Sequence, residues 1–172
     1  MSTKTPKNIN FLSPNGFELV IQKLPHIEWF VQDVEIPGVD APEVVQPNPL
    51  VPIKQQADQM NFSPLSISLA HDEEMKCWEE LFKWKLGIAF PNESKEHADL
   101  KKGSTLPPNG LFSDLSIIVA TSHHNPNLIF TFKDAFPISI SSLSLTSKNT
   151  DVPTLNFTVS FSYTSFSFDR LK

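Results

Sequence analysis

The sequence predicts a mainly β protein of the α+β type: an antiparallel β-sandwich or partial barrel with one flanking α-helix. Several segments alternate apolar with polar residues, the pattern of half-buried strands, and only one segment repeats apolar residues at helical spacing. The chain has 15 Pro against 5 Gly, which is typical of stiff, extended connections. Its 172 residues fit a single domain over residues 1–172.

Two strands are expected near the N-terminus, over residues 16–24 and 28–36. Apolar residues alternate in both segments: Phe17, Leu19 and Ile21 in the first, and Phe30, Val34 and Ile36 in the second. The Pro25 turn between the segments favours a β-hairpin.

Residues 37–59 form a long Pro-rich loop, with five prolines between Pro37 and Pro52. Proline cannot donate to a β-ladder, so we expect an extended, polyproline-like excursion and no central strand. The loop also carries apolar residues, which favour docking on another surface over free disorder. These residues are Val44, Val45, Leu50, Val51 and Ile53.

A third strand, with Leu65, Ile67 and Leu69 on one side, precedes the one predicted helix, over residues 72–87. Asp72 is expected to cap the start of this helix and Gly87 to end it. The stripe expected to pack on a sheet consists of Met75, Trp78, Phe82 and Leu86, with Leu81 beside it. Because Cys77 and Trp84 lie on another side, we expect part of the apolar surface to meet a neighbouring subunit.

The C-terminal half is expected to hold two further strand pairs after a polar, variable insertion at residues 91–109. The strands 111–121 and 127–136 flank a turn, and the strands 136–149 and 155–168 follow. The alternation changes parity at Ser141 and Ser142 and again between Tyr163 and Phe166. Such changes indicate bulges or corners where a strand passes from one sheet to another.

The composition and motifs indicate no enzyme, no cofactor and no metal site. The net charge of −5 argues against a protein that binds nucleic acid by neutralising phosphates. No Gly-rich phosphate loop, nucleophile elbow or zinc motif occurs, and the single Cys77 is expected to be a packing residue. His71 precedes the capping residues of a helix start, and His123 and His124 lie in a turn. No membrane span or signal peptide is evident, so synthesis in a cytoplasm is expected.

The closing strands are unusual because they lack charge: residues 137–147 and 152–168 contain no charged side chain, although they alternate apolar residues with Ser and Thr. The polar positions of the last strand are Asn156, Thr158, Ser160 and Ser162. Exposed edges of this kind would pair with other chains. The pattern therefore predicts terminal strands that lack partners in one subunit and are completed by identical copies around a closed ring.

The order of these parts resembles the tail tube proteins and tube-like baseplate hub proteins of contractile-tailed bacteriophages. The resemblance lies in FVQDVEIPG, FSPLSISL and DEEMKCWEELFKWKLG, and in a closing run that ends in NFTVSFSYTSFSF. It implies hexameric rings, stacked into a hollow inner tail tube of the virion through which DNA is ejected. It also implies sheath and baseplate proteins as partners, with the tape measure protein and DNA passing through the lumen. The loop at residues 37–59 would make contacts between subunits and between rings.

Several alternatives remain open from the sequence. The hydroxyl face of the last strand lines either the lumen or a subunit contact. Within the same machine, the protein could instead be a tube-like baseplate hub, a tube initiator or a tail terminator. A carbohydrate-binding β-sandwich of a tail fibre is a distant alternative from another class. It would expose its aromatic residues in loops, whereas most aromatics here lie in strands or in the helix.

Overall fold

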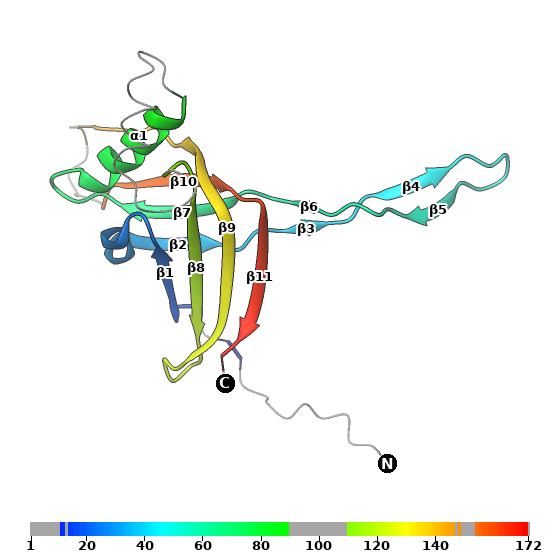
Figure 1. Ribbon diagram of the computed structural model, residues 1–172, viewed down its shortest axis with the longest axis horizontal. Coiled ribbons are helices and arrows are strands. Elements are labelled where there is room, and N and C mark those ends of the chain that lie inside the picture. Colours follow the sequence, from blue (N-terminus) through cyan, green and yellow to red (C-terminus); the bar gives the residue numbers. More distant parts are fainter. Residues whose placement is uncertain (1–10, 13, 90–109, 147, 149–153, 172) are drawn as a thin grey trace. The chain divides into compact units, whose positions relative to one another are not determined.

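The computed structural model describes residues 11–12, 14–89, 110–146, 148 and 154–171 (Figure 1). The chain divides into two compact units. Unit 1 consists of residues 1–29, 86–136 and 163–172, and unit 2 of residues 30–85 and 137–162. The expected insertion at 91–109 lies outside the described residues.

Unit 1 is an antiparallel sheet in the order β1, β8, β9, β11. The strands are β1 (Phe17–Ile21), β8 (Ser113–Ala120), β9 (Pro126–Ile140, whose last residues belong to unit 2) and β11 (Ser165–Arg170). Alternate residues of β1, β8 and β9 are buried as the core of this unit: Leu19, Ile21, Leu115, Ile117 and Phe132. The expected hairpin of β8 and β9 is confirmed.

The expected N-terminal hairpin is wrong. A 3-10 helix, η1 (Pro25–Phe30), follows β1 and buries Ile27, so the second strand begins only at Val31. That strand, β2 (Val31–Glu35), pairs with β7 (Leu65–Ala70), whereas β1 pairs with β8. Local alternation identified the strands, but their partners lie far away in the sequence.

Unit 2 contains a second antiparallel sheet, in which β10 (Asn156–Ser162) lies between β7 and the end of β9, and β2 lies outside β7. Phe157, Val159 and Phe161 of β10 are buried, and they pair with buried Leu69, Ile67 and Leu65 of β7. The expectation that both terminal strands are open edges is therefore wrong for β10, which has a neighbour on each side. The expectation is consistent with β11, because β9 is its only strand partner among the described residues and its other edge is open.

The helix α1 (Lys76–Ala89) packs on the unit 2 sheet through a face other than the expected one. Cys77, Leu81 and Trp84 are buried, and the Trp84 ring lies 6.2 Å from that of Phe161. The expected stripe is not the buried face: Met75 and Phe82 are exposed, and Trp78 and Leu86 are half-buried. The two apolar stripes are neighbours on the helix surface, and periodicity cannot choose between them.

The helix begins four residues later than expected, although Asp72 does cap it. The Lys76 backbone N–H donates to Asp72 Oδ2 at 3.1 Å, and the Met75 N–H donates to the Asp72 carbonyl. Met75 has a φ of 55°, so the chain turns before the first helical residue. This turn places Met75 outside α1 and helps to explain why it does not join the buried row.

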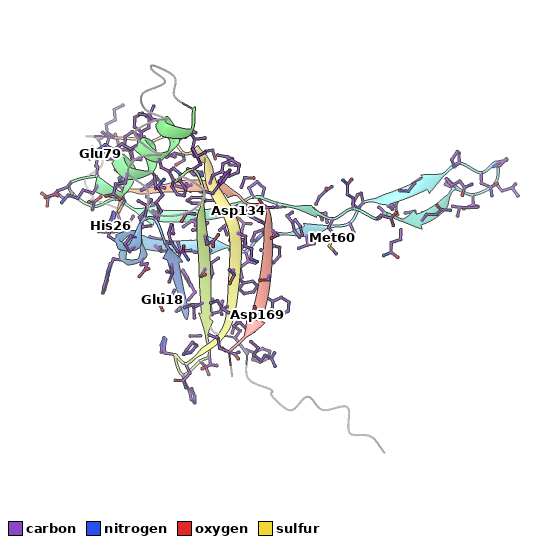
Figure 2. All side chains as sticks on the ribbon, in the orientation of Figure 1. Glu18, His26, Met60, Glu79, Asp134 and Asp169 are labelled. Atoms are coloured by element: carbon purple, nitrogen blue, oxygen red, sulfur yellow. The ribbon has the colours of Figure 1, made fainter. Side chains whose placement is uncertain are left out.

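The Pro-rich segment is a two-stranded ribbon, which we call the arm (residues 36–64). It contains β3 (Val39–Asp40), β4 (Glu43–Gln46), β5 (Ile53–Gln56) and β6 (Asn61–Phe62). β3 pairs with β6 and β4 with β5, so the arm extends β2 and β7 of unit 2 (Figure 1). The expected polyproline-like excursion is corrected here, because prolines fall between the strands and leave room for short ladders. Met60 marks the arm in Figure 2.

Two corners carry the chain from one sheet to the other. The break between β10, which pairs with β7, and β11, which pairs with β9, falls at Tyr163 and Thr164, where a corner was expected. The other corner was expected at Ser141 and Ser142, but β9 already changes partners after Ala135. Asp134 there has a φ of 54°, and its N–H donates to Asp114 Oδ1 at 3.2 Å.

The burial pattern of α1 predicts which substitutions destabilise the subunit. Leu81→Ala leaves a cavity under the helix and should lower the free energy of unfolding by about 2–5 kcal/mol. Phe82→Ala, on the exposed stripe, should cost about 1 kcal/mol or less. Urea denaturation at low protein concentration measures both values, and equal losses would contradict the assigned face.

His71 predicts a loss of stability in acid. Its ring lies 4.5 Å from Phe157, and both ring nitrogens are inaccessible and have no hydrogen-bond partner among the described residues. Burial lowers the His71 pKa below its ordinary value, and the nearby Asp72 carboxylate opposes this only in part. The unfolded chain therefore takes up a proton first as the pH falls below about 6.5, so stability decreases with falling pH down to the folded pKa.

His71→Phe keeps an aromatic ring against Phe157 but removes the proton site. The urea midpoint of this variant should fall less between pH 7.5 and pH 5 than that of the wild type. The two proteins differ in no other ionisable side chain, so the difference between the two slopes reports His71 together with its interaction with Asp72. Identical slopes would show that His71 is equally free to ionise in the folded and unfolded chains.

Candidate functional site

The polar face of the unit 2 sheet is the strongest candidate site. Asn156 and Thr158 are exposed, and Ser160 and Ser162 are half-exposed, whereas the residues between them are buried on the opposite face. These are the four positions singled out from the sequence, and the alternation of β10 places all of them on one face of a paired strand. We call this surface the hydroxyl face.

Strand pairing extends the hydroxyl face across β7 and β2. Thr158 is opposite Ser68, which is opposite Asp33. Two residues along, Ser160 is opposite Ser66, which is opposite Glu35. The face therefore consists of two cross-strand rows: Thr158, Ser68, Asp33, and Ser160, Ser66, Glu35.

A bulge in β2 decides which of its side chains join this face. The pairing of β2 with β7 shifts between Val31 and Asp33. The extra residue, Gln32, reverses the alternation, so Val31 lies on the apolar side while Asp33 lies on the hydroxyl side. Without the bulge, Val31 and Asp33 would share a face, and an apolar side chain would interrupt the polar surface.

Ser141, directly after β9, is bonded to β10 through its backbone N–H and its hydroxyl group. The Ser141 N–H donates to the Thr158 carbonyl at 2.8 Å, and the Thr158 N–H donates to Ser141 Oγ at 3.0 Å. Ser141 thus fixes the strand position of Thr158 from the side opposite β7.

The electrostatics of the face are simple. The described strands β2, β7 and β10 contain no Lys, Arg or His, and their only formal charges are the carboxylates Asp33 and Glu35. Both are exposed and lie on β2, the outermost strand of this sheet. The surface is therefore neutral over β7 and β10 and negative at its β2 border.

Sequence reasoning missed Ser66, Ser68, Asp33 and Glu35 as members of the face. The alternation of Ser66 and Ser68 with buried residues was a usable signal for β7. No local signal places Asp33 beside Ser68, because that neighbourhood comes from pairing between distant segments and from the bulge at Gln32.

The arm presents the apolar residues that the sequence analysis singled out. Val44, Val45, Leu50, Val51 and Ile53 are all exposed in the subunit. Glu43 and Lys54 pair at 2.9 Å on one side of the ribbon, and Gln55 donates to Gln46 at 3.0 Å on the other. A two-stranded ribbon without a covered face is marginal in water, so the arm is a candidate docking surface.

Trp78 and Phe82, on the expected stripe of α1, form a second, partly exposed apolar surface. The rings of Trp78 and Phe82 stack 4.9 Å apart at 11°, and Phe82 is 40% exposed. Charged residues adjoin the stripe, including a Glu79–Lys83 ion pair at 2.5 Å one turn apart. On its other side, α1 packs through Trp84 against Phe161, which lies on the buried face of β10. The hydroxyl face and the helix therefore lie on opposite sides of the unit 2 sheet.

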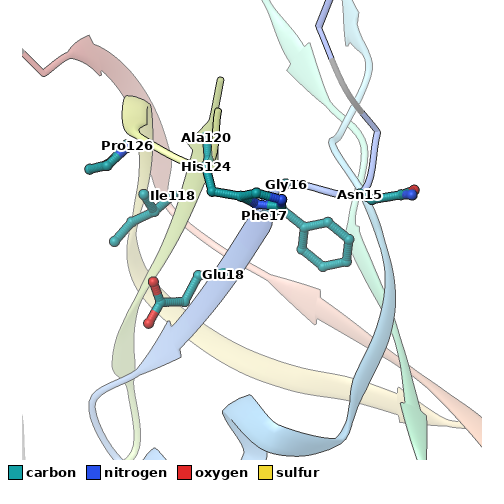
Figure 3. A pocket seen from close by; sticks show the side chains of 8 residues that line it. All are labelled: Asn15, Gly16, Phe17, Glu18, Ile118, Ala120, His124 and Pro126. Carbon is teal, nitrogen blue, oxygen red and sulfur yellow. The ribbon is translucent and has the colours of Figure 1, made fainter. Parts of the chain in front are cut away.

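Two open pockets flank the β8–β9 turn of unit 1. One, of about 280 Å³, is lined by residues of β1 and β8, with Glu18 and His124 directed apart (Figure 3). The other, of about 320 Å³, lies beside Phe11 and Leu12. Among the described residues, no group of three or more His, Cys, Asp and Glu side chains could hold a metal ion. None of the described helices is long and apolar enough to cross a membrane.

A family model of phage tail tube proteins matches residues 4–169, nearly the whole chain. No curated protein sequence matches this chain.

Solved structures with a similar fold come from contractile injection systems. The tube-terminating cap of the anti-feeding prophage is similar with a TM-score of 0.65 and 8% identity, over 99% of this chain and 100% of the other. A chain of an extracellular contractile injection system, from a sheath–tube complex in the extended state, gives a TM-score of 0.59 and 11% identity over 95% and 94%. A chain of the anti-feeding prophage baseplate gives 0.58 and 11% over 88% and 89%. At these identities the likeness shows the fold.

Proposed function

The chain belongs to the phage tail tube protein family, and we propose that it forms stacked, hexameric rings of the inner tail tube through which DNA is ejected. The family makes it a component of the virion tail with a structural role. The ring, the passage of DNA and the residues involved are the proposal. The hydroxyl face is the single observation that carries it.

The hydroxyl face suits the wall of a DNA channel. DNA binds proteins largely by exchanging its counterions for Lys and Arg, and the strands of this face offer neither. Asp33 and Glu35 repel phosphate, and hydroxyl groups hydrogen-bond to water as readily as to DNA. A polyanion can therefore pass along this wall without condensing on it.

The same sheet also supplies the means of ring closure. β2 and the end of β9 are the outer strands of the unit 2 sheet, and each has an edge without a described partner. Pairing of the β2 edge of one copy with the β9 edge of the next would continue the sheet around a ring. Closure removes exposed edges, and it places every hydroxyl face on the same side of the continuous sheet.

The arm and the opposite face of the sheet fit contacts with other proteins of the tail. An exposed ribbon with apolar residues is expected to dock on neighbouring copies within and between rings. If the hydroxyl face lines the lumen, α1 lies toward the outside, where sheath and baseplate proteins would meet it. The tape measure protein would occupy the lumen before DNA does.

A ring at the end of the tube is the second candidate, because the fold is shared with a tube-terminating cap over the full length of both chains. Copy number separates the two candidates. A main tube protein should be among the most abundant proteins of purified virions, whereas a baseplate hub, initiator or terminator ring should be present in few copies.

Assembly of the purified protein tests the proposed function directly. At rising concentration, electron microscopy should show rings or tubes of uniform bore, since the open edges of the sheet are completed by other copies. A protein that stays monomeric at every concentration would overturn the tube role.

Introducing positive charge tests the lumen assignment. The double variant Thr158→Lys, Ser160→Lys should form tails of normal appearance but slow DNA release, because each ring would carry cations that bind phosphate. The matched control, Thr158→Gln with Ser160→Gln, adds length without charge and should release DNA at the normal rate. Failure of both variants to assemble would instead place the face at a subunit contact.

Normal DNA release from intact tails of the Lys variant would contradict the lumen assignment. Release is measured by the fluorescence of a DNA-binding dye after triggering, in parallel with electron microscopy of the tails.

A further inference from the structure

The arm ends in a stiff, uncharged, apolar tip. Residues 47–52 connect β4 to β5 and contain Pro47, Pro49 and Pro52 but no charged side chain. Leu50 is 92% exposed and Val51 69% exposed. Prolines limit the conformations of a loop, so little entropy is lost when the tip is held by a partner. This tip is preorganised to insert into a surface.

A matching groove lies at the β8–β9 turn of unit 1. It has a volume of about 320 Å³ and is open to solvent. Phe11 and Leu12, which are 92% and 58% exposed, form its apolar part. The remainder is polar but carries no carboxylate and no Lys or Arg: Thr121, Ser122, His123, Asn125 and Asn127.

The turn beside the groove is held in place by its own hydrogen bonds. The Thr121 N–H donates to the Asn125 carbonyl at 2.8 Å, and the His124 N–H donates to the Thr121 carbonyl at 2.9 Å. Thr121 Oγ1 also accepts from the His123 and Asn125 backbone N–H groups. The polar wall of the groove is therefore formed before any partner arrives.

Two other exposed apolar surfaces, on α1 and on β11, fit the tip less well. The Trp78–Phe82 stripe on α1 adjoins the Glu79–Lys83 ion pair. Phe168 of β11, which is also exposed, is followed by Asp169 and Arg170. An uncharged tip docked on either surface would desolvate charges that it cannot pair. No Asp, Glu, Lys or Arg lines the groove, so it avoids this cost.

We infer that Leu50 and Val51 of the arm tip insert into the groove beside Phe11 and Leu12 of a second copy of the chain. The inference rests on the proposed function, because it names the receiving surface for the arm in the tube. Each copy then gives a tip and receives one through a different surface. Such a heterologous contact does not end at a dimer, and it continues into a ring or a stack.

Cysteine cross-linking in assembled protein tests this contact. Val51→Cys and Ser122→Cys place thiols on the tip and on the groove wall, both at exposed positions. Cys77 can stay in place, because burial raises the pKa of its thiol to about 11 and shields it from reagents. A short bismaleimide should join copies of the double variant into a ladder of dimers, trimers and longer products.

Mixed single variants provide the matched control for a heterologous contact. An equimolar mixture of Val51→Cys and Ser122→Cys proteins should give dimers only, because each chain carries one thiol. A second double variant carries Val51→Cys with Glu79→Cys, which lies beside the stripe on α1. This variant should give no ladder. A ladder with Glu79→Cys and none with Ser122→Cys would move the docking site to the helix and overturn the inference.

The result also separates this inference from the proposed function. Tubes that form normally but give no cross-link to Ser122→Cys would overturn the groove contact and leave the tube role standing. A wild-type protein that never forms rings or tubes would overturn both.

A substitution at the tip gives an independent measurement. Leu50→Asp should raise the concentration needed for assembly at least about tenfold, because a charge would enter an apolar contact. The thermal midpoint of the dilute subunit should not change, since Leu50 is almost fully exposed. Asn48→Asp, a control with the same added charge two residues away, should assemble nearly as the wild type does. Unchanged assembly of Leu50→Asp would contradict the insertion of the tip.

Discussion

The two-faced alternation of β10, held in register by β7, is the constraint on which the rest of the structure depends. Buried Phe157, Val159 and Phe161 pair with buried residues of β7, so a slip of one residue would expose the core and bury the hydroxyl groups. The same register that forms the core therefore also forms the hydroxyl face. A shift of register would therefore change the core and the proposed channel wall together, whereas a substitution at an exposed position of β10 changes the wall alone.

The surfaces left uncovered in the subunit are of different kinds, and the difference suggests different partners. The hydroxyl face is polar and lacks cations, so it needs only water or a passing polyanion. The arm is apolar at its tip and has no charge there, which suits contact between copies. The stripe on α1 combines stacked aromatic rings with neighbouring charges, as is common where a helix meets another protein.

The sequence alone determined the β class, the helix α1, most strand positions and the polar set Asn156, Thr158, Ser160 and Ser162. These features depend on local periodicity, which each segment carries in its own residues. It also determined the absence of charge on the closing strands and the family resemblance, which the match over residues 4–169 confirms.

The tertiary structure decided what depends on distant partners. It placed Ser66, Ser68, Asp33 and Glu35 beside the β10 hydroxyls, because pairing with β7 and the bulge at Gln32 bring them together. It chose Leu81 and Trp84 over Phe82 as the buried side of α1, because the unit 2 sheet covers only one of two adjacent apolar stripes. It also formed the Pro-rich segment into a ribbon, since ladder hydrogen bonds between β4 and β5 need a facing strand that no local pattern specifies.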